Sequence, residues 1–172
     1  MASEQSTPAY ELANTEGTMV SYFGALATIK ANSELADGSF GVTEYWAREG
    51  HASPWHIHLT ADEMFYILEG EVTGYTRNEN GEETSTTITT GGTFYIPKGL
   101  DHTFKVASEE AKMLTLFSPP HFEEWFVELG DPVETYELPQ PDAPDEAEEN
   151  ANAITPELCE RYDVEITGPP PV

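Results

Sequence analysis

Apolar and polar residues alternate in short segments through the middle of the chain. The segments are bounded by glycine, proline and asparagine, and residues near Glu71 and Thr84 alternate as expected for strands with one face toward water. The pattern predicts strands over residues 19–29, 40–46, 56–59, 63–68, 71–77, 84–90, 93–96, 102–106 and 113–117. Strands this short and this closely spaced indicate an all-β fold, an antiparallel sandwich or barrel.

Turn-forming residues mark the chain reversals between these strands. Asn80-Gly81 predicts a tight hairpin turn with both residues at positive φ, so the strands on either side should pair. Gly91-Gly92 marks a second reversal through the conformational freedom of glycine. Pro97-Lys98-Gly99 marks a third through the fixed φ of proline.

The period of the pattern changes after Pro119-Pro120. Aromatic and aliphatic residues now recur at helical spacing, and Gly130 follows where a helix would stop; they are Phe122, Trp125, Phe126 and Leu129. We expect a short helix over residues 121–129 that docks this face on the barrel. Its aromatic side chains are interpreted as core residues rather than ligand contacts.

The two ends of the chain read as an arm and an extension. Residues 131–153 are rich in Pro, Asp and Glu, which favours an extended or disordered connector. Thr155 and Pro156 then have the residue types of an N-cap and first helical turn, predicting a short helix to about Tyr162. The expected organisation is a polar arm at 1–17, a barrel at 18–130 and an acidic extension at 131–172.

The chain is strongly acidic. Its 172 residues include 7 Lys and Arg against 32 Asp and Glu, a formal charge of −25 with neutral histidines. Phosphate recognition needs a basic face, so the composition argues against nucleic acid and acidic membranes as partners. The acidic residues are spread along the sequence and lysine is scarce, which favours a halophilic protein over an ordinary acidic one.

The sequence gives no signal for export. The single cysteine, Cys159, cannot form an intrachain disulfide, and the first residues lack the basic start and apolar run of a signal peptide. No segment approaches the roughly 18 apolar residues of a membrane span. We therefore expect a cytoplasmic protein.

Three histidines and one glutamate of the strand-rich region form the candidate chemical site. His56 and His58 are two residues apart on a predicted strand, so their side chains project to the same face. Glu63 lies on the next strand and His102 leads a later one, so all four can converge inside a barrel. Three neutral imidazoles and one carboxylate make a site for a divalent transition metal.

The spacing of these residues resembles the two signature motifs of the cupin superfamily. The segment GHASPWHIHLTADEMFYILEG, from Gly50, has the residues of the first motif, and GGTFYIPKGLDH, from Gly91, has those of the second. Val106 stands where the second motif usually ends in Asn, a departure at a polar pocket contact that leaves the ligand set intact. The resemblance implies a double-stranded β-helix, or jelly-roll barrel, here followed by a short C-terminal helical extension. It also implies one divalent transition metal per chain (Fe, Mn, Ni, Co, Cu or Zn), held by His56, His58, Glu63 and His102.

Three further segments resemble the sequences of single-domain cupins that are similar to quercetin 2,3-dioxygenase; they are GALATIKA, HFEEWFVELGDP and EITGPPP. This similarity implies a dioxygenase that uses dioxygen to cleave a flavonol or similar small enolic or aromatic substrate. Glu63 would also be the base that takes the substrate's hydroxyl proton. The residues expected to line a pocket for a flat ring are Phe65, Tyr95, Phe104 and Trp55. His51 and His121 are interpreted as surface or pocket-rim residues, with His121 closer to the substrate.

Two other functional classes stay open from the sequence. The same metal could support non-oxidative chemistry, as in an isomerase, lyase or decarboxylase, by stabilising an enolate. The protein could also bind a small ligand without catalysis. Whatever the function, the exposed edges of a barrel and the resemblance to dimeric cupins predict a homodimer.

Overall fold

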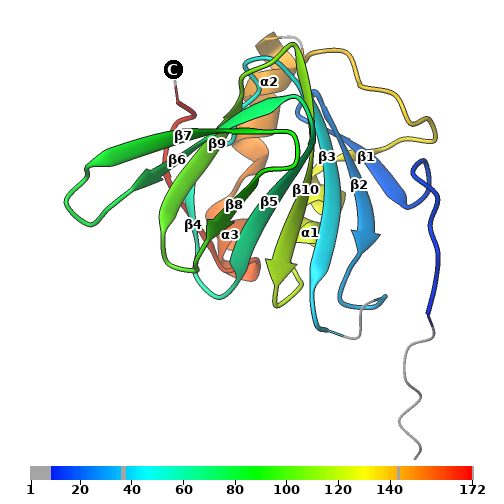
Figure 1. Cartoon of the computed structure of the whole chain (residues 1–172), viewed down its shortest axis with the longest axis horizontal. Helices are drawn as coiled ribbons and strands as arrows, with labels where there is room; N and C mark the ends of the chain where they lie inside the picture. Colours follow the sequence, from blue (N-terminus) through cyan, green and yellow to red (C-terminus); the bar gives the residue numbers. More distant parts are fainter. Residues whose placement is uncertain (1–8, 36–37, 143, 172) are drawn as a thin grey trace, which may run out of the picture.

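Two antiparallel sheets form the body of the protein in the computed structural model, which describes residues 9–35, 38–142 and 144–171 (Figure 1). One sheet has seven strands in the order β11-β1-β2-β3-β10-β5-β8, and the other has five in the order β12-β4-β9-β6-β7. The inner faces meet, since the rings of Phe65 on β5 and Phe104 on β9 lie 5.5 Å apart. The expected all-β jelly-roll architecture is confirmed.

The elements follow each other along the chain with few helices. The strands are β1 (Thr18–Tyr22), β2 (Ala25–Ala31), β3 (Gly41–Arg48), β4 (Trp55–His58), β5 (Asp62–Glu69), β6 (Glu71–Arg77), β7 (Glu83–Thr89), β8 (Thr93–Ile96), β9 (Asp101–Val106), β10 (Glu110–Ser118), β11 (Asp131–Pro132) and β12 (Val164–Gly168). The helices are α1 (Glu123–Leu129), α2 (Pro144–Ala153) and α3 (Pro156–Arg161). Every strand expected between residues 56 and 117 is present. No helix among the described residues has the length and apolar character needed to cross a membrane.

The first predicted strand is instead a hairpin. Residues 19–29 contain the turn between β1 and β2, where Phe23 and Gly24 have φ of 50° and 77°. Glycine adopts this left-handed conformation without a steric penalty, which permits the reversal. A single glycine beside a phenylalanine is a weak turn signal, so the hydrophobic pattern predicted one continuous strand across this position.

The turn between β6 and β7 pairs the strands as predicted but has a different conformation. Gly81 has a positive φ of 79°, whereas Asn80 does not. The side-chain oxygen of Asn78 accepts hydrogen bonds from the backbone N–H groups of Asn80 and Glu82, at 2.9 and 3.0 Å. The loop therefore closes with one left-handed residue, Gly81, and with the Asn78 side chain as its cap.

Helix α1 docks on the barrel as expected. Trp125 and Phe126 are buried, and the indole N–H of Trp125 donates to the hydroxyl of Tyr22 on β1 at 2.8 Å. The N-terminal arm lies beside β2 where it is described, because the Lys30 ammonium donates to the carbonyl oxygens of Asn14 and Glu16. The first eight residues of that arm lie outside the described part of the chain.

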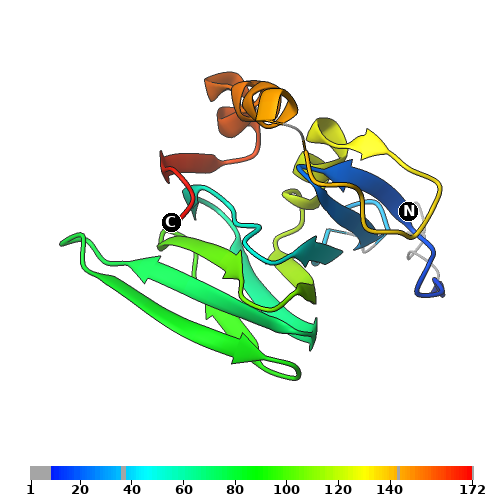
Figure 2. The ribbon, with the colours of Figure 1, turned by 90° about the horizontal axis from the view of Figure 1, so that it is seen from above.

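The C-terminal extension is more ordered than predicted. Residues 144–153 form α2, so the expectation of an extended or disordered connector is wrong there; the segment's alanine and glutamate content favours a helix. Helix α3 begins as predicted, with the Thr155 hydroxyl accepting from the backbone N–H of Leu158. Strand β12, which was not predicted, pairs with β4. Figure 2 shows this segment, orange to red, along one side of the two sheets.

Candidate metal centre and pocket

Four side chains meet between the two sheets. β4 supplies His56 and His58, β9 supplies His102, and β5 of the opposite sheet supplies Glu63. His56 lies directly opposite His102 in the pairing of β4 with β9. All four are buried, with exposed fractions of 8% or less. Their ligand atoms lie within 4.8 Å of one another, so the structure brings together the residues that the sequence singled out.

Backbone carbonyls orient two of the imidazoles. The Nδ1 atom of His56 is 2.9 Å from the carbonyl oxygen of Pro54, and Nδ1 of His102 is 2.9 Å from that of Leu100. Because a carbonyl oxygen only accepts, each Nδ1 carries a proton and donates it. A ring that carries its proton on Nδ1 alone presents the lone pair of Nε2 to the cluster, the form in which histidine binds a metal.

The atoms at the centre of the cluster fit a bound cation. The Oε2 atom of Glu63 is 2.9 Å from Nε2 of His102 and 3.3 Å from Nε2 of His58. The Nε2 atom of His58 is buried and makes no hydrogen bond with any residue that the structure describes. Lone-pair atoms held this close in a buried site require a positive charge between them, either a proton or a metal ion. Three imidazoles and one carboxylate suit a divalent transition metal.

Burial and neighbouring groups set the protonation of these residues. Burial lowers the pKa of His56 well below its usual value, and the nearby His102 and His58 lower it further. Burial acts to raise the pKa of Glu63, but its interactions with the nearby His102 and His58 outweigh that effect and lower the pKa. A neutral imidazole and an ionised carboxylate are the forms that bind metals.

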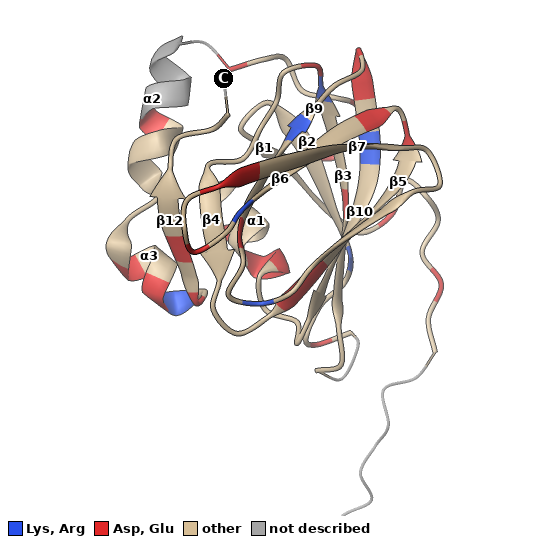
Figure 3. Cartoon of the chain, turned by 60° about the vertical axis from the view of Figure 1, so that its left-hand side comes forward, with Lys and Arg blue, Asp and Glu red and all other residues tan. Residues whose placement is uncertain are grey.

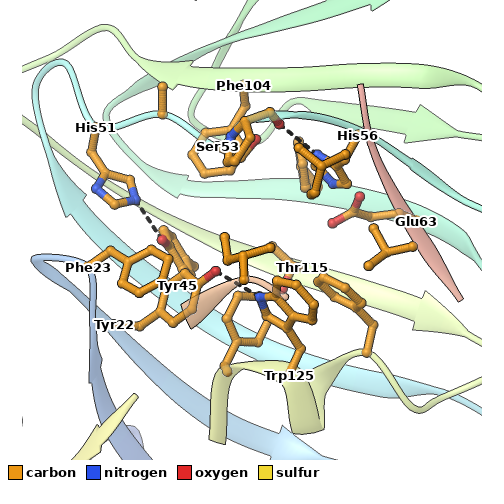
Figure 4. Close-up of a pocket in the computed structure, with 18 of the residues that line it drawn as sticks. Tyr22, Phe23, Tyr45, His51, Ser53, His56, Glu63, Phe104, Thr115 and Trp125 are labelled. Carbon is orange, nitrogen blue, oxygen red and sulfur yellow. Dashed lines mark hydrogen bonds between the residues drawn. The ribbon is translucent and has the colours of Figure 1, made fainter. Parts of the chain in front are cut away.

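A cavity of about 70 Å³ lies beside the cluster (Figure 4). His56 and Glu63 form part of its wall, and aromatic or aliphatic side chains from both sheets form most of the remainder. The aromatic residues of α1 (Phe122, Trp125 and Phe126) line it as well as belonging to the core, and the C-terminal segment adds Ile154, Val164 and Ile166. Among the described residues, no lysine or arginine lines it. An apolar cavity with a few polar groups is typical of a small-molecule site.

Two of the four residues expected to contact a substrate ring line this cavity, namely Phe65 and Phe104. Tyr95 is 58% exposed, because Phe94 and Ile96 take the inward positions of β8. Trp55 lies on the outer face of β4, with the Arg77 guanidinium 4.0 Å above its ring. The prediction for Tyr95 and Trp55 is therefore wrong, since strand alternation turns both away from the interior.

Of the two histidines outside the motifs, His51 rather than His121 lies at the main cavity. His51 lines the cavity, and its Nε2 is 2.6 Å from the hydroxyl of Tyr45. His121 is exposed, stacks on Tyr162, and borders only a smaller cavity beside His58. The expectation that His121 approaches the substrate more closely than His51 is wrong for the main cavity. No sequence motif marks His51, although the alternation of β3 places Tyr45 on the inner face beside it.

Comparisons with known proteins agree with this geometry. The family model described as a cupin domain matches residues 46–117. Quercetin 2,3-dioxygenase of Bacillus subtilis (strain 168) is 31% identical over 130 residues, which are 76% of this chain and 37% of that protein. The chain belongs to the cupin superfamily. This cupin therefore spans little more than a third of the length of the curated relative that it matches.

Solved structures share the fold of this cupin. An oxalate oxidase in complex with glycolate superposes with a TM-score of 0.55 at 22% identity, covering 69% of this chain and 64% of that one. The Bacillus subtilis oxalate decarboxylase, which has Mn(II) centres, gives a TM-score of 0.58 at 17% identity, covering 97% of this chain and 45% of that one. At this level of identity the similarity establishes the fold alone.

Proposed function

We propose that this cupin is a metal-dependent dioxygenase that uses dioxygen to cleave a small enolic or aromatic substrate, such as a flavonol. The observation that carries the proposal is a buried cluster of three histidines and one glutamate at the wall of an aromatic cavity. The similarity to a quercetin 2,3-dioxygenase supports the reaction type. His56, His58, Glu63 and His102 would hold one divalent transition metal, which when bound supplies Lewis acidity and one-electron chemistry toward dioxygen.

Glu63 has a second role in this proposal. Glu63 contacts the histidines and also lines the cavity, so an enolic hydroxyl of a bound substrate can reach its carboxylate. In its ionised form Glu63 accepts the hydroxyl proton and leaves an electron-rich enolate. Phe65 and Phe104 pack against the substrate ring, and the apolar wall keeps water away from the reacting atoms.

The proposal is tested by oxygen uptake. Protein reconstituted separately with each candidate metal is mixed with a panel of flavonols and simpler enols in an oxygen electrode, and substrate loss is followed by absorbance. We expect one metal form to consume one dioxygen per substrate. Substrate loss without oxygen uptake would replace the proposal by a non-oxidative isomerase, lyase or decarboxylase. Retained metal with no turnover of any substrate would favour a binding protein.

The role of Glu63 is separable from that of the histidines. The variant Glu63→Gln keeps an amide oxygen that can contact a metal but cannot accept a proton. We expect it to retain part of its metal and to lose turnover by at least about a hundredfold, the usual scale for a general base. The matched control is Glu69→Gln, the same change at an exposed position of β5. Turnover of Glu63→Gln at the wild-type rate would contradict both roles.

A further inference from the structure

Polar groups gather in the cavity apart from the metal-binding cluster. The Tyr45 hydroxyl lies 2.6 Å from Nε2 of His51, and the Trp125 indole N–H donates to the Tyr22 hydroxyl at 2.8 Å. All four residues line the cavity, and the rings of Tyr22 and Tyr45 meet edge to face. Figure 4 shows the Tyr45–His51 pair on the side of the cavity opposite Glu63, with the Tyr22–Trp125 pair between.

These polar groups keep unused hydrogen-bonding capacity. The Tyr22 hydroxyl accepts from Trp125, and no acceptor for its own hydrogen lies among the described residues. The Nε2 atom of His51 faces Tyr45, whereas its Nδ1 atom has no partner in the same part of the chain. Tyr22 is buried, so a ligand acceptor beside its hydroxyl would complete the hydrogen bonding of that group, whereas His51 is only partly buried.

Charge limits what can bind beside these groups. Burial lowers the pKa of His51 to about 4 and raises the pKa of Tyr45 well above its usual value, so both are neutral near pH 7. No lysine or arginine in the described part of the chain lines the cavity, and the whole chain carries a charge of −25. A ligand carboxylate next to Tyr22 would be buried without a counter-charge, which is strongly unfavourable.

We infer that Tyr22 and the Tyr45–His51 pair form a second binding site in the cavity, for a neutral hydroxyl or carbonyl group of the substrate. This inference rests on the proposed function, because the metal cluster holds the enolic end of the same molecule. The substrate class is then a compact, uncharged enol with an oxygen at its far end, rather than a dicarboxylic acid. The Tyr22 hydroxyl is the donor to that oxygen, since Trp125 already occupies one of its acceptor positions.

Two small chelators test the inference. Kojic acid and allomaltol bind metals through the same enol and ketone oxygens, and they differ only in that kojic acid carries a hydroxymethyl group where allomaltol carries a methyl. Both probes are single-ring compounds of nearly equal size, so the limited volume of the cavity, about 70 Å³, acts on the two alike. Calorimetry on the zinc-loaded protein measures both dissociation constants, and zinc has no redox chemistry that would turn the ligands over.

The wild-type protein should bind kojic acid about fivefold more tightly than allomaltol, the factor expected for one neutral hydrogen bond. In Tyr22→Phe and Tyr45→Phe the ratio should approach one while allomaltol affinity stays unchanged, which a loss of structure would not produce. The matched control is Tyr66→Phe, the same change at an exposed position of β5 outside the cavity, and it should keep the wild-type ratio. Tyr45→Phe leaves the Trp125–Tyr22 bond in place, so it remains informative if Tyr22→Phe folds poorly.

The possible failures separate the inference from the proposed function. A wild-type ratio near one, or a ratio preserved in both Tyr22→Phe and Tyr45→Phe, overturns the second binding site while chelation of both ligands still supports the enol-binding cluster. If neither ligand binds the zinc-loaded wild-type protein, the proposed enol-binding function fails together with this inference.

Discussion

Metal binding depends on the side chains whose nitrogen or oxygen lone pairs point into the cluster. Carbonyl groups fix the Nδ1 protons of His56 and His102, so their Nε2 atoms reach the cluster with lone pairs. The paired substitution His56→Ala/His58→Ala removes both ligands from β4 and leaves too few donors to compete with water. We expect affinity for the metal to fall by more than about a hundredfold, a larger loss than substitutions outside the ligand set cause.

Elemental analysis after dialysis measures this loss, with circular dichroism as the check on folding. The control is His121→Ala, which removes an exposed histidine outside the cluster and should keep about one metal per chain. Full metal content in the double variant would exclude these histidines as ligands.

Burial of His51 makes the stability of the fold depend on pH. Its pKa is about 4 in the folded protein, against 6.5 for an ordinary histidine, because burial disfavours the charged form. As the pH falls below 6.5 the unfolded chain binds a proton that the folded chain does not, so the free energy of unfolding decreases. Between pH 7 and pH 5 the loss from this residue is about 1–2 kcal/mol.

Urea unfolding at both pH values tests this dependence in wild type and His51→Gln, which keeps a polar side chain without a titratable ring. The variant should lose less stability on acidification than the wild type, and His121→Gln should behave as wild type. The residues of the metal cluster are the same in all three proteins, so the comparison isolates His51. Equal losses in wild type and His51→Gln would contradict the prediction.

The sequence identified the metal cluster more reliably than the cavity wall. Alternation on one short strand puts His56 and His58 on the same face, and the motif spacing adds the other two residues. The sequence placed Tyr95 and Trp55 on the wrong face because an aromatic side chain can lie on either face of a strand, and its residue type alone does not say which. The Tyr45–His51 contact depends on how two segments pack, which no local pattern records.

The C-terminal segment completes the sheet that carries the histidines. In the pairing of β12 with β4, Val164 lies opposite His58 and Ile166 opposite His56. Val164 is also buried in the core and lines the cavity. The acidic, proline-rich composition concealed this strand, because a partner strand more than about a hundred residues away along the chain cannot be recognised from a short stretch of sequence. The segment therefore belongs structurally to the site rather than to a separate tail.

The helix cap at Thr155 tests how strongly this segment is anchored. Its hydroxyl accepts from the Leu158 N–H at 3.2 Å, and Leu158 and Tyr162 are buried in the core cluster. Thr155→Ala removes the cap and should lower the free energy of unfolding by about 1 kcal/mol, measured by urea denaturation. Thr155→Ser keeps a capping hydroxyl and should lose much less. Equal stability of wild type and Thr155→Ala would show that packing alone holds α3.

The fold of the whole molecule was predictable because many short strands, tight turns and two spaced motifs all indicated the same barrel. The homodimer, the cytoplasmic location and the division into arm, barrel and extension stay predictions. The halophilic interpretation also stays a prediction. It concerns the charge of the whole molecular surface.

Screening of that charge gives the last prediction. Acidic residues appear on strands, loops and helices across the face in Figure 3, where basic residues are few. With a charge of −25 on 172 residues, the carboxylates repel one another over distances that salt shortens from about 10 Å at 0.1 M to about 3 Å at 1 M. The melting temperature should therefore rise with KCl at fixed pH and metal loading, and most of the rise should be complete by about 1 M. A midpoint still climbing above that concentration would indicate salting-out of apolar surface or specific cation binding as well. A melting temperature that stays flat or falls with KCl would exclude the halophilic interpretation. Salt that screens the repulsion between carboxylates in the folded protein must raise its stability.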